Sequence, residues 1–372
     1  MLSVIGAGVA SQRTSLDFSV IYKRSDMYRS QIEELERQMP LDWLEGVSAS
    51  KSNAYVRTFW SQIGYLCRRN FVEYWRTHSY AMYRILVVAG LALLISFAFI
   101  DKRGVLTSSA DVQSWVSSIM IMVSVLGNYN IVTIIPFVFT HKALYYRERA
   151  SRMYSPYAYA IGNNLVEDPY IVAEVLLSLI VYYFMIGYVT DPLWTFFYFL
   201  LISWLFTQAM TFLGLFFAVV MPDAASAQVF GMLTSQVLGL FSGIMVLPSV
   251  IPGYLKWIYY ISPQRWVQEG LITTQFEFLE NPICVPTGSA IVSSDCPDTY
   301  VNTTINQQNV CCPRGSLAMT ARDFVGSETF LGGPDGYKFE WRFYDLIFLA
   351  SVVFVARTLG IFFQAKINHN KR

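Results

Sequence analysis

The stretch from Val112 to Thr140 most restricts what this chain can fold into, because its 29 residues include no Asp, Glu, Lys or Arg. A helix of about 20 apolar residues crosses a bilayer core of about 30 Å, so this stretch is long enough to span a membrane. The overall composition agrees, since only 14% of the 372 residues are charged, against roughly 25% in a typical soluble domain. The sequence therefore predicts an integral membrane protein.

Five further runs have the same character, and two of them contain one charged residue each. In chain order, the six predicted spans are Ile85–Ile100, Val112–Thr140, Pro169–Thr190, Pro192–Met221, Ala224–Leu255 and Leu346–Ala365. The charges are Glu174 in the third span and Arg357 in the sixth. Charges within spans are costly and are therefore functional candidates. Two interpretations stay open, namely that these side chains extend to the inner interface or that they form an interhelical pair.

The distribution of Lys and Arg predicts the orientation, because cytoplasmic segments retain positive charge during insertion. Residues 1–84 contain eleven such residues, the segment after the second span contains four, and the tail after the sixth contains three. The connection between the third and fourth spans contains none. We therefore expect both termini in the cytosol and residues 251–342 outside.

Cysteine usage fits this orientation, because disulfides and N-glycans form in the secretory lumen or outside the cell. Four cysteines lie in the external segment, together with the glycosylation sequon that begins at Asn302. A bridge between the adjacent Cys311 and Cys312 would be strained, so we favour each of them pairing with Cys284 or Cys296. One of the four could instead join two subunits.

The residues before the first span divide into two parts. Residues 1–54 read as a cytosolic linker with one polar helix that ends before Pro40. Residues 55–79 alternate aromatic and basic positions with helical spacing, which is typical of an amphipathic helix on the inner membrane surface. A soluble helix packed on a neighbouring domain is the alternative.

Motifs for catalysis are missing from the sequence. Gly6 and Gly8 have the spacing of a dinucleotide fingerprint, but Ser11 replaces the third glycine and no βαβ unit surrounds them. No lysine follows a glycine, which excludes a P-loop, and the three histidines show no metal-ligand spacing. We expect no catalytic residue, metal or cofactor in this chain and, with a net charge of +1, no nucleic-acid partner. Transport, channel activity or a scaffold role remain.

Several segments resemble the second transmembrane domain of the pleiotropic drug resistance group in the G subfamily of ABC transporters, and most closely its oomycete members. The segments are "LDFSVIYKRSDMYR", "EYWRTHSYAMYRIL", "LYYRERASRMYSPYAYAIGNNLVEDPY", "YLKWIYYISPQRWVQEGLITTQF" and the closing "INHNKR". The resemblance implies an all-α polytopic fold of the ABC-2 type. Its expected parts are six transmembrane helices, with spans one to five in 80–250, an amphipathic elbow helix, a cytosolic coupling helix near 141–160, a disulfide-braced external loop with a re-entrant segment in 251–342, and the last span with its tail in 343–372.

The same resemblance implies the function. It predicts the transmembrane part of an ATP-driven exporter of lipid-like or amphipathic organic compounds in the plasma membrane. ATP and Mg²⁺ would bind a partner nucleotide-binding domain, and a second transmembrane domain would complete the pathway. The chain would then be a fragment or a separate gene product that follows an absent ATPase domain. An ATP-independent channel or scaffold subunit is the alternative.

Individual residues carry the remaining expectations. Tyr129 lies between Asn128 and Asn130 in an uncharged span, so this polar face should point toward protein or water, and interhelical hydrogen bonding alone is the other interpretation. By resemblance, the substrate cavity comprises Asn128, Tyr129, Gln236 and Gly239, the gate above it comprises Ile244 and Met245, and contact with the ATPase domain is made by Tyr146, Arg147, Glu148 and Arg149.

Overall fold

The computed structural model describes two compact units, residues 1–56 and 57–372. The described residues are 22–38, 55, 57–100, 109–279, 282–286, 300–305, 308–313, 316–327, 331 and 337–367. In the first unit the described helix is α2 (Asp26–Gln38), which confirms the polar helix predicted before Pro40. The Ser25 hydroxyl accepts a hydrogen bond of 3.3 Å from the Tyr28 N–H and so satisfies one donor at the start of this helix.

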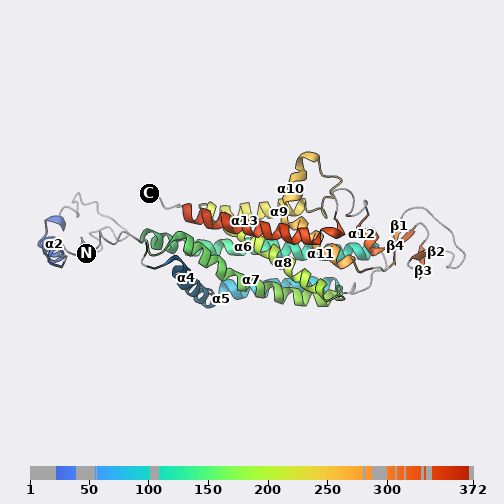
Figure 1. Ribbon diagram of the computed structural model, residues 1–372, viewed down its shortest axis with the longest axis horizontal. Coiled ribbons are helices and arrows are strands. Elements are labelled where there is room, and N and C mark those ends of the chain that lie inside the picture. The colour runs from blue at the N-terminus through green and yellow to red at the C-terminus, as the bar shows by residue number, and fades with distance from the viewer. Residues whose placement is uncertain are drawn as a thin grey trace, which may run out of the picture. The chain divides into compact units, whose positions relative to one another are not determined.

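The second unit is built around long helices that run side by side (Figure 1). Helix α6 packs against α8 and α9, α8 packs against α13, and α5 packs against α7. Among the described residues of this unit, the α-helices are α4 (Phe59–Arg76), α5 (His78–Ala98), α6 (Ser109–Ala150), α7 (Pro156–Ile186), α8 (Trp194–Val220), α9 (Ala224–Leu240), α10 (Lys256–Ile261), α11 (Pro263–Phe276), α12 (Ala321–Val325) and α13 (Arg342–Lys366). Two short 3-10 helices are η2 (Gly253–Leu255) and η3 (Phe339–Trp341).

Within the described residues, five helices are long and apolar enough to cross a membrane, namely α5, α6, α7, α8 and α13. The predicted fifth span, Ala224–Leu255, was wrong in its extent, because helix α9 ends at Leu240. The chain then passes through Gly243, whose φ of 102° is favourable only for glycine, and reaches Pro248. The 17 residues of α9 cover about 25 Å at 1.5 Å per residue.

The charged segment after the second span is not a separate helix, contrary to our expectation of a coupling helix near 141–160. Residues 141–150 continue α6, since neither glycine nor proline interrupts this stretch. The turn that follows contains Arg152 with a φ of 52°, and the Met153 N–H donates to the Glu148 carbonyl, which closes the end of the helix. Helix α7 then begins with Pro156, whose fixed φ suits the first helical position.

Helix α4 occupies the region predicted to be amphipathic. Ile63, Leu66 and Tyr74 are buried, and α4 packs against α7. The opposite side exposes large aromatic side chains, with 79% of Trp60 and 69% of Trp75 accessible. Such a face is typical of a helix that lies in a membrane interface.

Short strands in the 282–320 region depart from the predicted all-α class. Strand β1 (Pro282–Pro286) pairs antiparallel with β4 (Ser316–Thr320), and β2 (Tyr300–Ile305) pairs antiparallel with β3 (Gln308–Pro313). β-branched residues such as Val301 and Thr303 favour strands, although the cysteine pattern suggested only a loop braced by disulfides. The membrane-type helices themselves agree with the expected class.

A buried cluster of charges connects three of these helices. Arg84 on α5 donates from Nε to Glu174 on α7 over 2.7 Å, and its Nη1 pairs with Glu167 on the same helix. Asn130 on α6 donates to the other Glu174 oxygen over 2.8 Å. All four side chains are at most 3% exposed. The cluster therefore ties α5, α6 and α7 together.

A second ion pair decides the question left open for the intramembrane charges. Arg357 on α13 pairs with Asp168 on α7, and the same nitrogen donates to Gln208 on α8 over 3.0 Å. Glu174 and Arg357 thus each form an interhelical pair, but with Arg84 and Asp168 respectively. The sequence suggested a pair between the two because Arg84 and Asp168 lie just outside the predicted spans.

Replacing Glu174 by Leu is expected to destabilise the protein by about 3–5 kcal/mol, because Arg84 stays buried and loses a partner. Glu174→Gln should cost less, since its amide oxygen can still accept from Arg84. The midpoint of thermal unfolding of the detergent-solubilised protein measures both effects. Leu177→Ala is the control, because Leu177 lies on the same helix and is 45% exposed. An unchanged midpoint for Glu174→Leu would contradict the stabilising role of the cluster.

Candidate functional site

A cavity of about 260 Å³ lies where α6, α9 and α11 meet. It brings together four residues that the sequence predicted for the substrate cavity and its gate, namely Asn128, Gln236, Gly239 and Met245. The other lining residues are Met120, Ser124, Ser235, Leu240, Gln264 and Gln268. The wall therefore combines amides and hydroxyls with apolar side chains, and contains no formally charged side chain. Such a lining suits an uncharged or amphipathic molecule.

Hydrogen bonds fix part of this wall. The Ser235 hydroxyl on α9 donates to Asn128 Oδ1 on α6 over 2.6 Å. Gln264 on α11 is 1% exposed and makes two long contacts of 3.4 Å from Nε2 to Ser235. Its Oε1 accepts no hydrogen bond from the described residues. Because a Cβ at Gly239 would collide with that oxygen, glycine is what allows the Gln264 amide to lie against α9.

Tyr129 lies elsewhere. It lines a second and more open cavity of about 420 Å³ with Tyr80, Arg84, Thr133 and Gln228, between α5, α6 and the start of α9. Successive residues of a helix point about 100° apart, so Asn128 and Tyr129 face different cavities. The predicted cavity residues are therefore divided between two sites on different faces of α6.

The two gate candidates also differ in their surroundings. Ile244 is half-buried and packs against the hydrophobic core. Met245 is 61% exposed and lines the 260 Å³ cavity. Both follow the end of α9 at Leu240, in irregular backbone rather than in a helix.

The residues expected to contact an ATPase domain lie at the end of α6, and two of them contact this chain instead. Glu148 accepts from Arg69 on α4 over 3.0 Å and from the Tyr154 hydroxyl over 2.6 Å. Burial, together with this hydrogen bond, raises the pKa of Tyr154, so its hydroxyl remains a donor. Arg149 donates to the carbonyls of Ala365 and Ile367 over 2.7 and 3.1 Å.

Several side chains of α6 thus satisfy carbonyls at the ends of other helices. Besides Arg149, Tyr145 donates to the Gln364 carbonyl at the end of α13 over 2.9 Å. Lys142 donates to the carbonyls of Ala218 and Met221 at the end of α8 over 3.2 and 3.0 Å. The last carbonyls of a helix lack intrahelical donors and carry partial negative charge, which basic side chains compensate.

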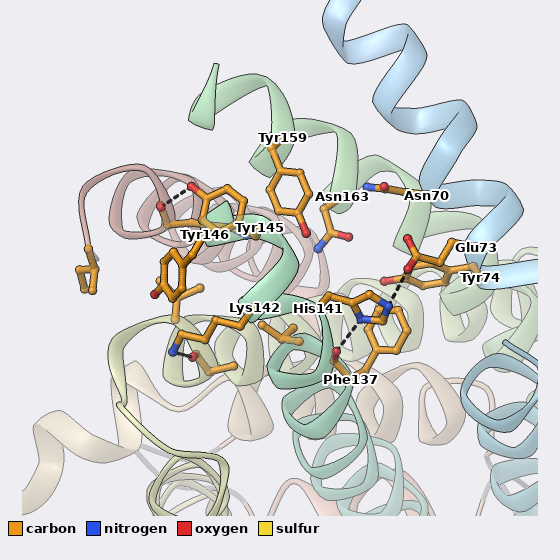
Figure 2. A pocket seen from close by; sticks show the side chains of 15 residues that line it. Asn70, Glu73, Tyr74, Phe137, His141, Lys142, Tyr145, Tyr146, Tyr159 and Asn163 are labelled. Atoms are coloured by element: carbon orange, nitrogen blue, oxygen red, sulfur yellow. Dashed lines mark hydrogen bonds and ion pairs between the residues drawn. The ribbon is translucent and has the colours of Figure 1, made fainter. Parts of the chain in front are cut away.

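Figure 2 shows the small cavity that α6 lines beside these contacts, with a volume of about 30 Å³. His141 Nε2 lies 2.7 Å from Glu73 Oε1 on α4, and its Nδ1 lies 2.8 Å from the Phe137 carbonyl. Tyr146 is half-buried at the same cavity, whereas Arg147 is exposed. Arg147 is therefore the most accessible of the four candidate contact residues.

The external cysteines and the sequon fall largely outside what the structure describes. Cys296 lies outside the described residues, as do the side chains of Cys284, Cys311, Cys312 and Asn302. The backbone places Asn302 opposite Cys311 in the β2–β3 pair. The disulfide pairing and the glycosylation therefore stay predictions. Within the described residues, no group of three His, Cys, Asp or Glu side chains lies close enough together to hold a metal ion.

Six of the ten residues that line the cavity were not predicted from the sequence, among them Ser235, Gln264 and Gln268. Gln264 and Gln268 are four residues apart on α11, a helix in which every residue is buried. Two glutamines on one face of an otherwise enclosed helix are a signal that could have identified them. The predicted external re-entrant segment includes this helix, and that prediction did not relate its polar face to the cavity.

Comparison with known proteins identifies the family. Residues 61–276 match the family described as "ABC-2 type transporter". "ABC transporter G family member 41" of Arabidopsis thaliana is 31% identical over 279 residues, which are 74% of this chain and 20% of that protein. "Pleiotropic drug resistance protein 1" of Nicotiana tabacum is 29% identical over 275 residues, or 73% of this chain and 19% of that protein.

The chain thus spans about one fifth of the length of these relatives. The matched residues include α5 to α9 and α11, which together form the amide-lined cavity and the buried charge cluster. A domain of this family serves transport across a membrane, and the long apolar helices agree with that setting. This chain belongs to the ABC-2 type transporter family and is a transmembrane domain of the G subfamily of ABC transporters.

Proposed function

We propose that this chain forms half of the translocation pathway of an ATP-driven exporter of lipid-like or amphipathic organic compounds. ATP and Mg²⁺ bind a nucleotide-binding domain outside this sequence, and a second transmembrane domain completes the pathway. The observation that carries the proposal is the 260 Å³ cavity, because it combines Asn128, Gln236 and Gly239 in a polar but uncharged wall. An uncharged wall of amides and methionines accommodates molecules with both polar and apolar parts.

The position of Tyr129 adds a second contact for such cargo. Its ring lines the 420 Å³ cavity, where Tyr80 and Tyr83 supply further aromatic surface. Aromatic side chains offer a large apolar area together with a hydroxyl, which suits flat amphipathic compounds. We propose that cargo contacts this aromatic cavity before it reaches the amide-lined one.

Contact with the ATPase domain is assigned mainly to Arg147. Glu148 and Arg149 are engaged with α4 and α13, so their part is to hold the end of α6 in place. Arg147 is exposed in the turn of α6 that precedes Arg152. A guanidinium at this position can form a charge-assisted hydrogen bond with an acidic surface.

The topology that we propose has six spans, with α9 as the fifth, and both termini in the cytosol of a plasma-membrane protein. The count of basic residues supports this orientation. Residues 251–342 would then form an external loop that contains the buried helix α11, is braced by disulfides among its four cysteines and carries a glycan on Asn302. Amphipathic α4 would lie in the inner interface.

Gly239→Ala is expected to lower export several-fold without loss of protein, because the added Cβ displaces the Gln264 amide from the cavity wall. Export of rhodamine 6G, a flat amphipathic dye, by cells that express the complete transporter measures this effect. Gly90→Ala is the matched control, since nothing lies within 4 Å of a Cβ at that position. Equal dye export by both variants at equal surface levels would argue against the cavity as the substrate path.

Arg147→Glu is expected to reduce substrate-stimulated ATP hydrolysis by the complete transporter to a small fraction, while the unfolding midpoint stays within about 1 °C of wild type. Glu148→Arg should instead lower the midpoint, because it places a cation beside Arg69. Arg322→Glu is the control for charge reversal at an exposed arginine on α12. Full stimulation in Arg147→Glu would mean that the ATPase contact lies elsewhere.

A further inference from the structure

A second cluster of buried charged side chains lies between α11 and α13, separate from the Arg84 cluster. It comprises Arg265 and Glu269 on α11 and Asp345 in the first turn of α13, with exposed fractions of 1%, 0% and 0%. Arg265 Nη2 lies 3.0 Å from Glu269 Oε2, one helical turn away. Charges that are removed from water in this way require compensation by partners in the protein.

Glu269 has that compensation. Besides Arg265, the Lys338 N–H donates to its Oε1 over 2.8 Å. The guanidinium of Arg265 also lies 4.4 Å from the centre of the Tyr259 ring and 4.2 Å from that of the Trp266 ring. This pair is therefore neutral as a whole and has aromatic rings against its cation, while Arg265 Nε and Nη1 donate no hydrogen bond to the described residues.

Asp345 differs from Glu269 in this respect. Neither of its carboxyl oxygens receives a hydrogen bond from the described residues. The nearby hydroxyls donate elsewhere, Tyr198 to the Arg342 carbonyl over 2.8 Å and Tyr337 to the Ser242 carbonyl over 2.9 Å. If Asp345 were ionised, the single cation Arg265 would stand beside two carboxylates, and Asp345 would have no hydrogen bond from the described residues in place of its lost hydration.

Space at this carboxyl is also limited. A Cβ built on Gly270 would lie 3.2 Å from Asp345 Oδ2 and 2.7 Å from the Tyr198 hydroxyl oxygen, so α11 and α13 approach closely here. The titratable or charged groups beside Asp345 are Arg265 and Glu269 from α11, Tyr198 from α8 and Tyr337 from the segment before α13. Around these lie Tyr259 from α10, Lys338 from the segment before α13 and Arg342 from α13 itself.

We propose that Asp345 and Glu269 form a proton-binding site in which Asp345 holds the proton as a neutral carboxylic acid. Protonation removes the second negative charge and leaves Arg265 and Glu269 as a neutral pair. A proton also needs no more room than the closed site offers. The acid O–H becomes a donor in a cluster where Glu269 Oε2 accepts no hydrogen bond from the described residues.

The bound proton makes the contact between α11 and α13 dependent on pH. An aspartate in an unfolded chain releases its proton at about pH 4. The folded protein therefore holds a proton that the unfolded chain has lost at neutral pH, and its stability falls as the pH rises. Because α11 also carries Gln264 and Gln268, the site links this protonation to the helix that lines the cavity.

Infrared difference spectroscopy of the complete transporter at neutral pH tests the proposal directly. The spectrum of the wild type minus that of Asp345→Asn is expected to contain the carbonyl stretching band of a protonated carboxylic acid. Glu340→Gln, at an exposed position five residues earlier, should leave that band in place. Absence of the band from the wild type between about pH 5 and pH 7 would overturn the proposal.

Thermal unfolding provides a second measurement. The midpoint of the wild type is expected to fall by several degrees more than that of Asp345→Asn between about pH 6 and pH 9. Glu269→Gln remains informative if Asp345→Asn fails to fold, because Arg265 can then pair with an ionised Asp345. In that variant the infrared band should disappear at a lower pH than in the wild type. Equal pH dependence in the wild type and both variants would refute a proton at this site.

Discussion

The pairing of Arg84 with Glu167 and Glu174 is the interaction on which the arrangement of the long helices depends. An arginine buried among apolar helices is costly unless carboxylates lie beside it. Both carboxylates come from α7, so α5 must lie against α7, and Asn130 extends the same requirement to α6. Helix packing in a membrane lacks a strong hydrophobic driving force, so such polar contacts select one arrangement among many apolar ones.

The cluster of charge at the end of α6 has a related explanation. Lys142, Glu148 and Arg149 lie close together in a sequence with few charged residues. The reason is that α8 and α13 end beside this part of α6 and that α4 contacts it. Lys142 satisfies the end of α8, Arg149 satisfies the end of α13, and Glu148 holds α4. The contacts that fix the end of the bundle therefore leave Arg147 as the exposed residue among the four candidates.

Sequence reasoning succeeded where a physical signal was continuous along the chain. The uncharged run around Val112–Thr140 located α6, and the residues quoted for the family located the domain that the comparisons confirm. It failed where apolar composition hid a break, as at Gly243 after α9. Partners distant in the sequence, such as Arg84 for Glu174, could not be identified either, because a charge at the edge of a span looks the same whether it faces water or another helix.

The continuity of α6 has a mechanical consequence. Its 42 residues form a rod of about 63 Å at 1.5 Å per residue, with Asn128 near its middle and Arg147 at its end. Pro136 removes one backbone hydrogen bond between these two positions and is therefore the point at which the rod bends most easily. The half of α6 that lines the cavity and the half that carries Arg147 are therefore joined at the weakest point of the rod.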